Sequence, residues 1–175
     1  MIHQAVSARS QAAEMTTPQP GRVSVPLLER TRAGRALSAS RYRNAESFFL
    51  AIQETRFANS SDLLYLTGIV AQMALTTHLL DVGFDDRWCV RHVGLHIAPA
   101  LSYANATGLN YRSSEFERLA VVLSPYSIWR NPGLDGSRPP VPESLSNIPP
   151  ILRELLDHVR SVTGHPRARP GNTHG

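Results

Sequence analysis

The sequence contains no lysine, and all eighteen of its basic side chains are arginines. Because arginine codons are GC-rich and lysine codons are AT-rich, a complete absence of lysine favours the codon usage of a high-GC genome, and a bacterial source is the simplest interpretation. Guanidinium groups bind phosphate and carboxylate in a bidentate manner. Function rarely excludes lysine everywhere, however, so this absence alone does not indicate such a ligand.

Cysteine is nearly absent as well. Cys89 is the only one, so the chain forms no internal disulfide and shows no sign of a secreted, disulfide-stapled domain. The N-terminal region lacks the apolar run of a secretory signal. It is rich in arginine and serine and poor in acids, as organellar transit peptides are, but the all-arginine composition extends through the whole chain. We therefore prefer a bacterial leader and expect a cytoplasmic protein.

The positive charge is concentrated near the two ends. Residues 1–43 carry seven arginines and two acids, whereas residues 44–164 carry nine arginines and twelve acids. Residues 165–175 add two arginines and no acid. A mildly acidic central part argues against a DNA-binding core, because nucleic-acid binding needs a basic surface.

Composition also predicts the domain organisation. Residues 1–43 are polar and interrupted by prolines, which predicts a disordered, Arg-rich N-terminal tail. Residues 44–164 predict a single helical domain, and residues 165–175 a disordered C-terminal tail. We find no internal repeat and no convincing strand pattern. The expected fold is all-α, with about five helices packed as a small irregular bundle.

Capping residues predict where these helices begin and end. The expected signals are Asn44 as a first N-cap, a new cap over residues 59–61 with Asp62 opening a second helix, Gly83 closing it, and Asp85 or Asp86 before a third. Pro99 predicts a break or kink within that third helix, Ser114 with Glu117 a capping box, and Gly164 the end of the last helix.

The second predicted helix is the most apolar part of the chain. Eighteen residues without a formal charge lie between Asp62 and Asp81. Gln72, His78 and several threonines interrupt this run, and polar groups are costly in hydrocarbon. No aromatic belt or positively charged flank accompanies it. We therefore expect a buried central helix rather than a membrane span, and no membrane partner.

Potential metal ligands gather in and around GFDDRWCVRHVGLH, residues 83–96. His78 precedes this stretch by about one turn, and Cys89, His92 and His96 follow at spacings of three and four, which makes them neighbours on a helix. The four side chains could bind zinc, which takes nitrogen and sulfur ligands. The alternative is structural: Cys89 packs as a small hydrophobic residue, and the histidines form hydrogen bonds near the start of the helix.

We prefer the structural alternative and expect no resident cofactor. Val93 stands where the HExxH motif has its glutamate, and there is no second cysteine. Cys89 and His92 could instead form a nucleophile–base pair, but no oxyanion site accompanies them. We therefore predict no catalytic residues, with zinc binding as an alternative.

A degenerate helix-turn-helix over residues 104–118 is the nucleic-acid alternative. It would direct Arg112 and Arg118 into a groove of DNA. Glu115 and Glu117 would face phosphate unfavourably, and Ser114 falls where an apolar residue is needed. The Arg-rich N-terminal tail could also bind nucleic acid through counterion release.

The residue types favoured at protein interfaces occur together in Tyr126, Trp129 and Arg130. They form a partner-binding patch if exposed, although burial of Trp129 explains the same pattern. The sequence lacks a phosphate-binding glycine loop and a complete catalytic set. Our preferred hypothesis is therefore a helical protein that binds a protein partner, as a regulatory or accessory factor, and a homo-oligomer is compatible with it.

Overall fold

The computed structural model describes residues 28–130, 140–142 and 145–167. These residues form an all-α fold and contain no strand, which confirms the predicted class. The elements are α1 (Arg32–Glu54), α2 (Ser60–Val82), α3 (Asp86–His92), α4 (Ile97–Ala106), α5 (Ser114–Val122), the 3-10 helix η1 (Tyr126–Trp129), the 3-10 helix η2 (Leu145–Asn147) and α6 (Ile148–Thr163).

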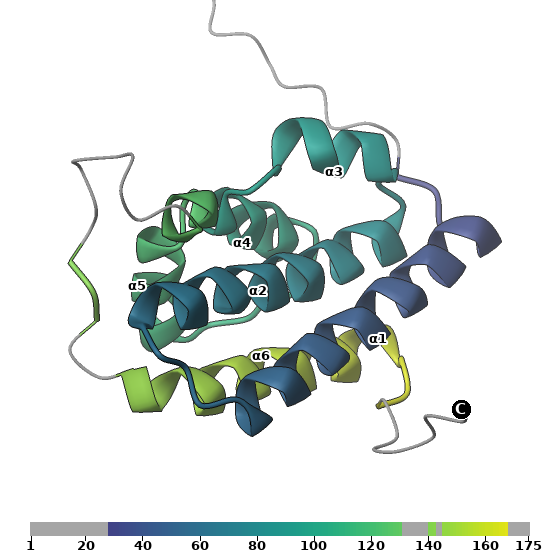
Figure 1. Cartoon of the computed structure of the whole chain (residues 1–175). Helices are drawn as coiled ribbons and strands as arrows, with labels where there is room; N and C mark the ends of the chain where they lie inside the picture. The colour runs from purple at the N-terminus through teal and green to yellow at the C-terminus, as the bar shows by residue number, and fades with distance from the viewer. Residues whose placement is uncertain (1–27, 131–139, 143–144, 168–175) are drawn as a thin grey trace, which may run out of the picture.

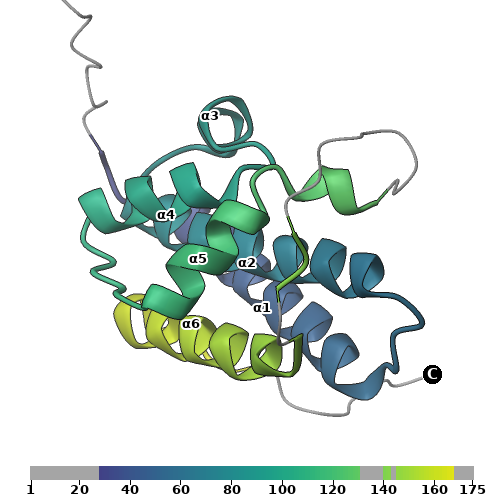
Figure 2. The same ribbon diagram turned by 90° about the vertical axis from the view of Figure 1, so that its left-hand side faces the viewer.

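The bundle is built around α2. The two longest helices, α1 and α2, form an antiparallel pair, and α6 packs against both of them (Figure 1). Helix α4 and η1 also pack against α2. Helix α5 lies between α4 and α6 and contacts both (Figure 2). The core therefore lies between the α1–α2 pair, α6 and the short helices that follow α2.

Helix α2 begins and ends as its caps predict. The Asn59 side chain accepts a hydrogen bond from the Asp62 amide at 2.8 Å, and Gly83 ends the helix in a left-handed conformation with φ of 117°. By length and composition α2 is the one helix in the described residues that could cross a membrane. However, 72% of its most apolar window is buried inside the protein, as in the core helix of a globular domain.

The predicted boundary at residue 43 is wrong. Helix α1 begins at Arg32, and the Thr31 hydroxyl caps it by accepting from the Gly34 amide at 2.9 Å. Ser38 and Tyr42 are fully buried, so this Arg-rich segment is part of the core. Asn44 lies within α1 and caps nothing. The apolar pattern did not predict this part of α1, because its inward-facing side chains are a serine and a tyrosine rather than aliphatic residues. Residues 1–27 lie outside the described residues.

Two other helix boundaries also differ from the prediction. The expected third helix is two helices, because α3 ends at His92 and α4 begins at Ile97. Pro99 lies in the first turn of α4, where its missing amide donor costs nothing. Helix α5 is capped by Ser113 rather than Ser114, with the Phe116 amide 3.3 Å from the Ser113 hydroxyl.

At the other end of the domain, Gly164 ends α6 as predicted, but the ordered structure continues past it. His165 is buried, and Arg167 Nη2 lies 2.6 Å from Asp157 Oδ1. The predicted C-terminal tail therefore begins too early at residue 165. Residues 168–175 lie outside the described residues.

Candidate functional site

The four residues of the zinc hypothesis do not come together. His78 is buried in α2 with its Nε2 3.2 Å from Thr107 Oγ1, and Cys89 is buried in α3. His92 and His96 are both exposed, and the His92 ring stacks on Trp88 at 4.5 Å. Because α3 ends at His92, the four-residue spacing to His96 does not lie on one helix.

Within the described part of the chain, no group of three or more histidine, cysteine, aspartate or glutamate side chains is placed to hold a metal ion. The Cys89 thiol is also poorly suited to nucleophilic chemistry. Burial, with a smaller contribution from the Asp86 carboxylate, raises its pKa to about 12. The thiolate, which is the reactive form, is therefore scarce near neutral pH.

The predicted partner-binding patch is not at the surface. Tyr126 and Trp129 are buried, and only Arg130 is exposed. The Tyr126 hydroxyl donates to Gln72 Oε1 at 3.2 Å, and Trp129 Nε1 donates to the Val122 carbonyl at 3.1 Å. The prediction of an exposed aromatic patch is therefore wrong, because both rings belong to the core around α2.

The predicted helix-turn-helix is not formed. Residues 107–113 separate α4 from α5, whereas the motif joins its helices by three or four residues. The side chain of Asn105 fixes the shape of this connection. Its Nδ2 donates to the Tyr111 backbone carbonyl at 3.0 Å, and its Oδ1 accepts from the Tyr111 backbone N–H at 2.8 Å. Arg112 lies in the connection and Arg118 lies on α5, and they border two different grooves.

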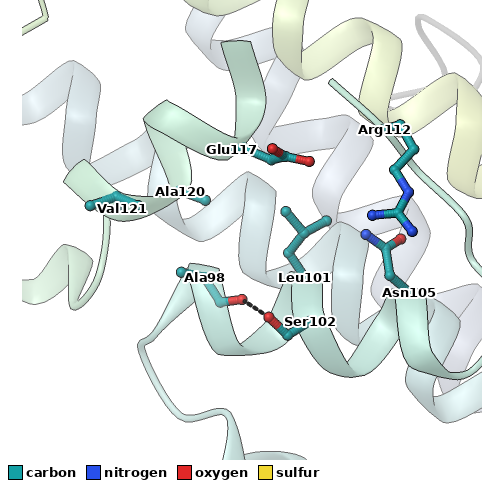
Figure 3. A pocket seen from close by; sticks show the side chains of 8 residues that line it. All are labelled: Ala98, Leu101, Ser102, Asn105, Arg112, Glu117, Ala120 and Val121. Carbon is teal, nitrogen blue, oxygen red and sulfur yellow. Dashed lines mark hydrogen bonds between the residues drawn. The ribbon is translucent and has the colours of Figure 1, made fainter. Parts of the chain in front are cut away.

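A groove of about 390 Å³ between α4 and α5 is the strongest candidate site (Figure 3). We call it the α4–α5 groove, and its lining residues are Ala98, Leu101, Ser102, Asn105, Arg112, Glu117, Ala120 and Val121. Leu101 and Ala120 are buried and form its apolar floor, whereas the Val121 side chain is 66% exposed. The site thus combines a small apolar surface with polar groups from two helices and their connection.

The charged groups of the α4–α5 groove are available to a ligand. Arg112 and Glu117 are exposed, and neither side chain forms an ion pair or hydrogen bond with another described residue. Figure 3 shows the Arg112 side chain directed toward Asn105, with Glu117 beside Leu101. Since Nδ2 and Oδ1 of the Asn105 side chain both bind the Tyr111 backbone, Asn105 holds the groove in shape. The groove therefore presents one guanidinium and one carboxylate beside apolar carbon.

A second groove, of about 550 Å³, lies between α5, α6 and the segment Pro140–Pro142. Arg118 borders it together with Glu115. Residues 131–139 and 143–144, on either side of Pro140–Pro142, lie outside the described residues. We therefore assign no function to this groove.

The structure also brings together a serine, a histidine and an aspartate that the sequence analysis did not connect. His165 Nε2 lies 2.7 Å from Ser38 Oγ and 4.0 Å from Asp81 Oδ1, and Arg30 Nη2 lies 3.2 Å from Asp81 Oδ2. We call these four residues the Asp81 cluster. Nothing in the sequence could have revealed it, because its members come from both ends of the domain and from α2.

The Asp81 cluster does not have the geometry of a catalytic triad. The Ser38 hydroxyl donates to the Thr77 carbonyl at 2.7 Å, so its proton does not point to His165. The same nitrogen of His165 faces both Ser38 and Asp81, whereas a triad uses opposite ring nitrogens for the two partners. All three side chains are also buried. The cluster therefore joins the chain ends to α2 rather than presenting a nucleophile.

Comparison with known proteins gives no match: no family model, no curated protein and no solved structure matches this sequence.

Proposed function

We propose that the protein acts by binding another protein, a segment of which docks in the α4–α5 groove. The observation that carries this proposal is the exposed Val121 side chain beside a buried apolar floor, with the unpaired Arg112 and Glu117 next to it. Protein interfaces are built in this way, with apolar contacts at the centre and polar groups at the rim.

The lining of the groove defines the partner's chemistry. A partner's apolar side chain would pack on Leu101, Ala120 and Val121, and the small side chains of Ala98 and Ser102 leave room for close approach. A carboxylate of the partner would pair with Arg112 in a bidentate manner, and a basic residue would pair with Glu117. An amphipathic helix with this pattern is the simplest segment that satisfies all three contacts.

The same groove favours binding over catalysis. Its one hydroxyl, Ser102 Oγ, donates to the Ala98 carbonyl at 3.1 Å, and no histidine or cysteine lines it. A regulatory or accessory role in the bacterial cytoplasm remains part of this proposal, and it rests on composition rather than on the groove.

Affinity capture from extracts of the source cells tests the proposal. Full-length tagged chain is compared with Val121→Asp, with Arg112→Glu and with Val90→Asp. Val90 is a matched control, because it is also 66% exposed but lies on α3, outside the groove. We expect one protein to be retained by the wild type and by Val90→Asp and to be lost from both groove variants.

Two other outcomes argue against the proposal. Identical sets of captured proteins from all four chains would show that the groove is not the docking site. Loss of every captured protein after nuclease treatment of the extract would favour the nucleic-acid alternative. In that case, binding should also fall steeply with added salt.

A further inference from the structure

A largely apolar surface lies along the outer side of the α1–α2 pair, away from the α4–α5 groove. We call it the α1–α2 outer face, and its residues are Leu37, Asn44, Phe48 and Ala51 of α1 and Leu66, Ile69 and Met73 of α2. Asn44 is the one polar side chain among these seven. Figure 1 shows the two helices side by side, with α4 behind α2. The inference drawn from this face is independent of the proposed function.

The register of the two helices fixes which residues are neighbours. Arg41 Nη1 lies 3.5 Å from Thr76 Oγ1, and the helices run in opposite directions. Seven residues onward from Arg41 along α1 is Phe48, and seven residues back from Thr76 along α2 is Ile69. Phe48, which is 37% exposed, is therefore beside the half-buried Ile69 at the centre of the face.

Helix α2 lacks the polar outer side that a surface helix normally has. Its inward side is fully buried. The half-buried side next to α1 is also apolar and carries Leu66, Ile69 and Met73. A helix that is apolar all round is normally covered all round, and exposed apolar patches mark interaction sites. Among the described elements, none covers this side of α2.

The charges at the two ends of the face indicate what covers it. Arg41 reaches Thr76 at one end and Asp62 is exposed at the other, and Thr76 and Asp62 are each seven residues from Ile69. Each end is thus about 10 Å from the centre. A two-fold axis through the centre would place the Arg41 of one copy opposite the Asp62 of the other.

Both of these groups can take a further partner. Arg41 Nη2 already binds Asp86 Oδ1 at 2.6 Å, but a guanidinium has five donors. Asp62 Oδ2 accepts from the Asn59 side chain at 2.8 Å, which leaves its second carboxylate oxygen. The pairing in both halves of the interface would be identical, as two-fold symmetry requires.

We infer that the occupant of the α1–α2 outer face is a second copy of this chain, and that the protein is a homodimer. The face extends about 10 Å to either side of its centre and the helix pair is about 20 Å wide, which gives about 400 Å² on each copy. This is about half of the roughly 800 Å² that each partner contributes to a standard interface, so the dimer is expected to be weak and to form at the higher concentrations.

The experiment is a molar-mass measurement by light scattering on the full chain, over a range of concentrations. At the higher concentrations we expect twice the 19.3-kDa mass of one chain. Phe48→Asp should weaken dimerisation at least about 100-fold, because it places a charge at the centre of the interface. Val162→Asp is the matched control, since Val162 is 38% exposed but lies on α6, and it should leave the dimer intact.

Charge reversal provides a second test that does not alter the apolar centre. Asp62→Arg should weaken the dimer, and adding Arg41→Asp should restore it, because the two pairs are then re-formed with opposite signs. Circular dichroism confirms that each variant is folded. A wild-type chain that stays at 19.3 kDa at every concentration overturns the inference. So does a dimer that Phe48→Asp and Asp62→Arg both leave intact.

Discussion

Arg153 of α6 donates two hydrogen bonds to Glu46 of α1: Nη1 lies 3.0 Å from Oε2 and Nη2 lies 2.6 Å from Oε1. The Tyr42 hydroxyl donates to the same carboxylate at 2.6 Å. Glu46 is buried and Arg153 is about a quarter exposed, with its guanidinium 5.0 Å from the centroid of the Phe49 ring. This pair fastens the first helix of the bundle to the last.

Glu46→Gln is expected to lower the free energy of unfolding by about 2 kcal/mol at pH 7, because it leaves the partly buried Arg153 with only the more exposed Asp157, 3.2 Å away, as its countercharge. Chemical denaturation measures this loss. Arg153→Met on its own should also be destabilising, and the double variant should lose less than the two single losses added together. Strict additivity would show that the two side chains do not stabilise each other.

The same carboxylate predicts a loss of stability in acid. Burial alone would raise the pKa of Glu46, but the hydrogen bonds from Arg153 and Tyr42 outweigh it and lower the pKa below its ordinary value. A lowered folded-state pKa gives stability that is complete above the unfolded-state pKa and is lost as the pH falls through the folded-state pKa. Unfolding measured between about pH 5 and pH 2 should therefore depend less on pH in Glu46→Gln than in the wild type.

Two buried histidines predict a second pH effect, nearer neutrality. Burial lowers the pKa of His78 and of His165, although Asp81 acts in the opposite direction on both. Stability should therefore fall as the pH drops below about 6.5, the ordinary histidine value, toward these lowered pKa values. His165→Gln should flatten this part of the profile. A profile unchanged by His165→Gln would contradict the assignment.

Cys89 should be unreactive in the folded protein. It is buried, and its pKa of about 12 keeps the thiolate scarce. We expect modification by a disulfide reagent at pH 8 to be at least about 100-fold slower than in the denatured chain. Rapid modification under native conditions would show that α3 opens readily or that the thiol is exposed.

Gly68 should not tolerate a side chain. A Cβ added there would overlap the Cβ and ring of Tyr126, at a point where η1 lies against α2. Gly68→Ala is expected to cost about 2 kcal/mol despite the better helix propensity of alanine. Tyr126→Phe, which removes only the hydrogen bond to Gln72, should cost about 1 kcal/mol. Thermal unfolding of the two variants would compare these losses directly. A Gly68→Ala variant as stable as the wild type would show that η1 is free to move.

The sequence predicted best where apolar pattern and caps agreed. Helix α2 combines an uncharged run with Asn59 and Asp62 at its start and Gly83 at its end, and all three signals act locally. The start of α1 was missed because Ser38 and Tyr42 are buried through contacts with distant segments: Ser38 binds Thr77 and His165, and Tyr42 binds the Leu156 carbonyl. Local pattern carries no signal for such pairings.

The candidate site depended still more on tertiary contacts. The local sequence around Tyr126 and Trp129 would be the same whether the two rings faced solvent or packed against α2. Only the tertiary structure determines that they are buried. Arg112 was predicted to contact DNA as part of a helix-turn-helix. In the structure it lines the α4–α5 groove beside Asn105, which holds the turn, and Glu117, and the helix-turn-helix pattern predicts neither neighbour. The residue could be found from the sequence, whereas its neighbours could not.

The place of α6 in the bundle has a consequence for synthesis of the protein. Its Leu152, Leu155, Leu156 and Val159 are fully buried, yet α6 is the last of the described helices to be synthesised. Until it leaves the ribosome, the inward sides of α1 and α2 lack the layer that covers them, although the other described helices are already made. The nascent chain therefore passes through a stage with a long apolar hairpin open to water, and during that stage it should depend on chaperones that bind exposed hydrophobic segments.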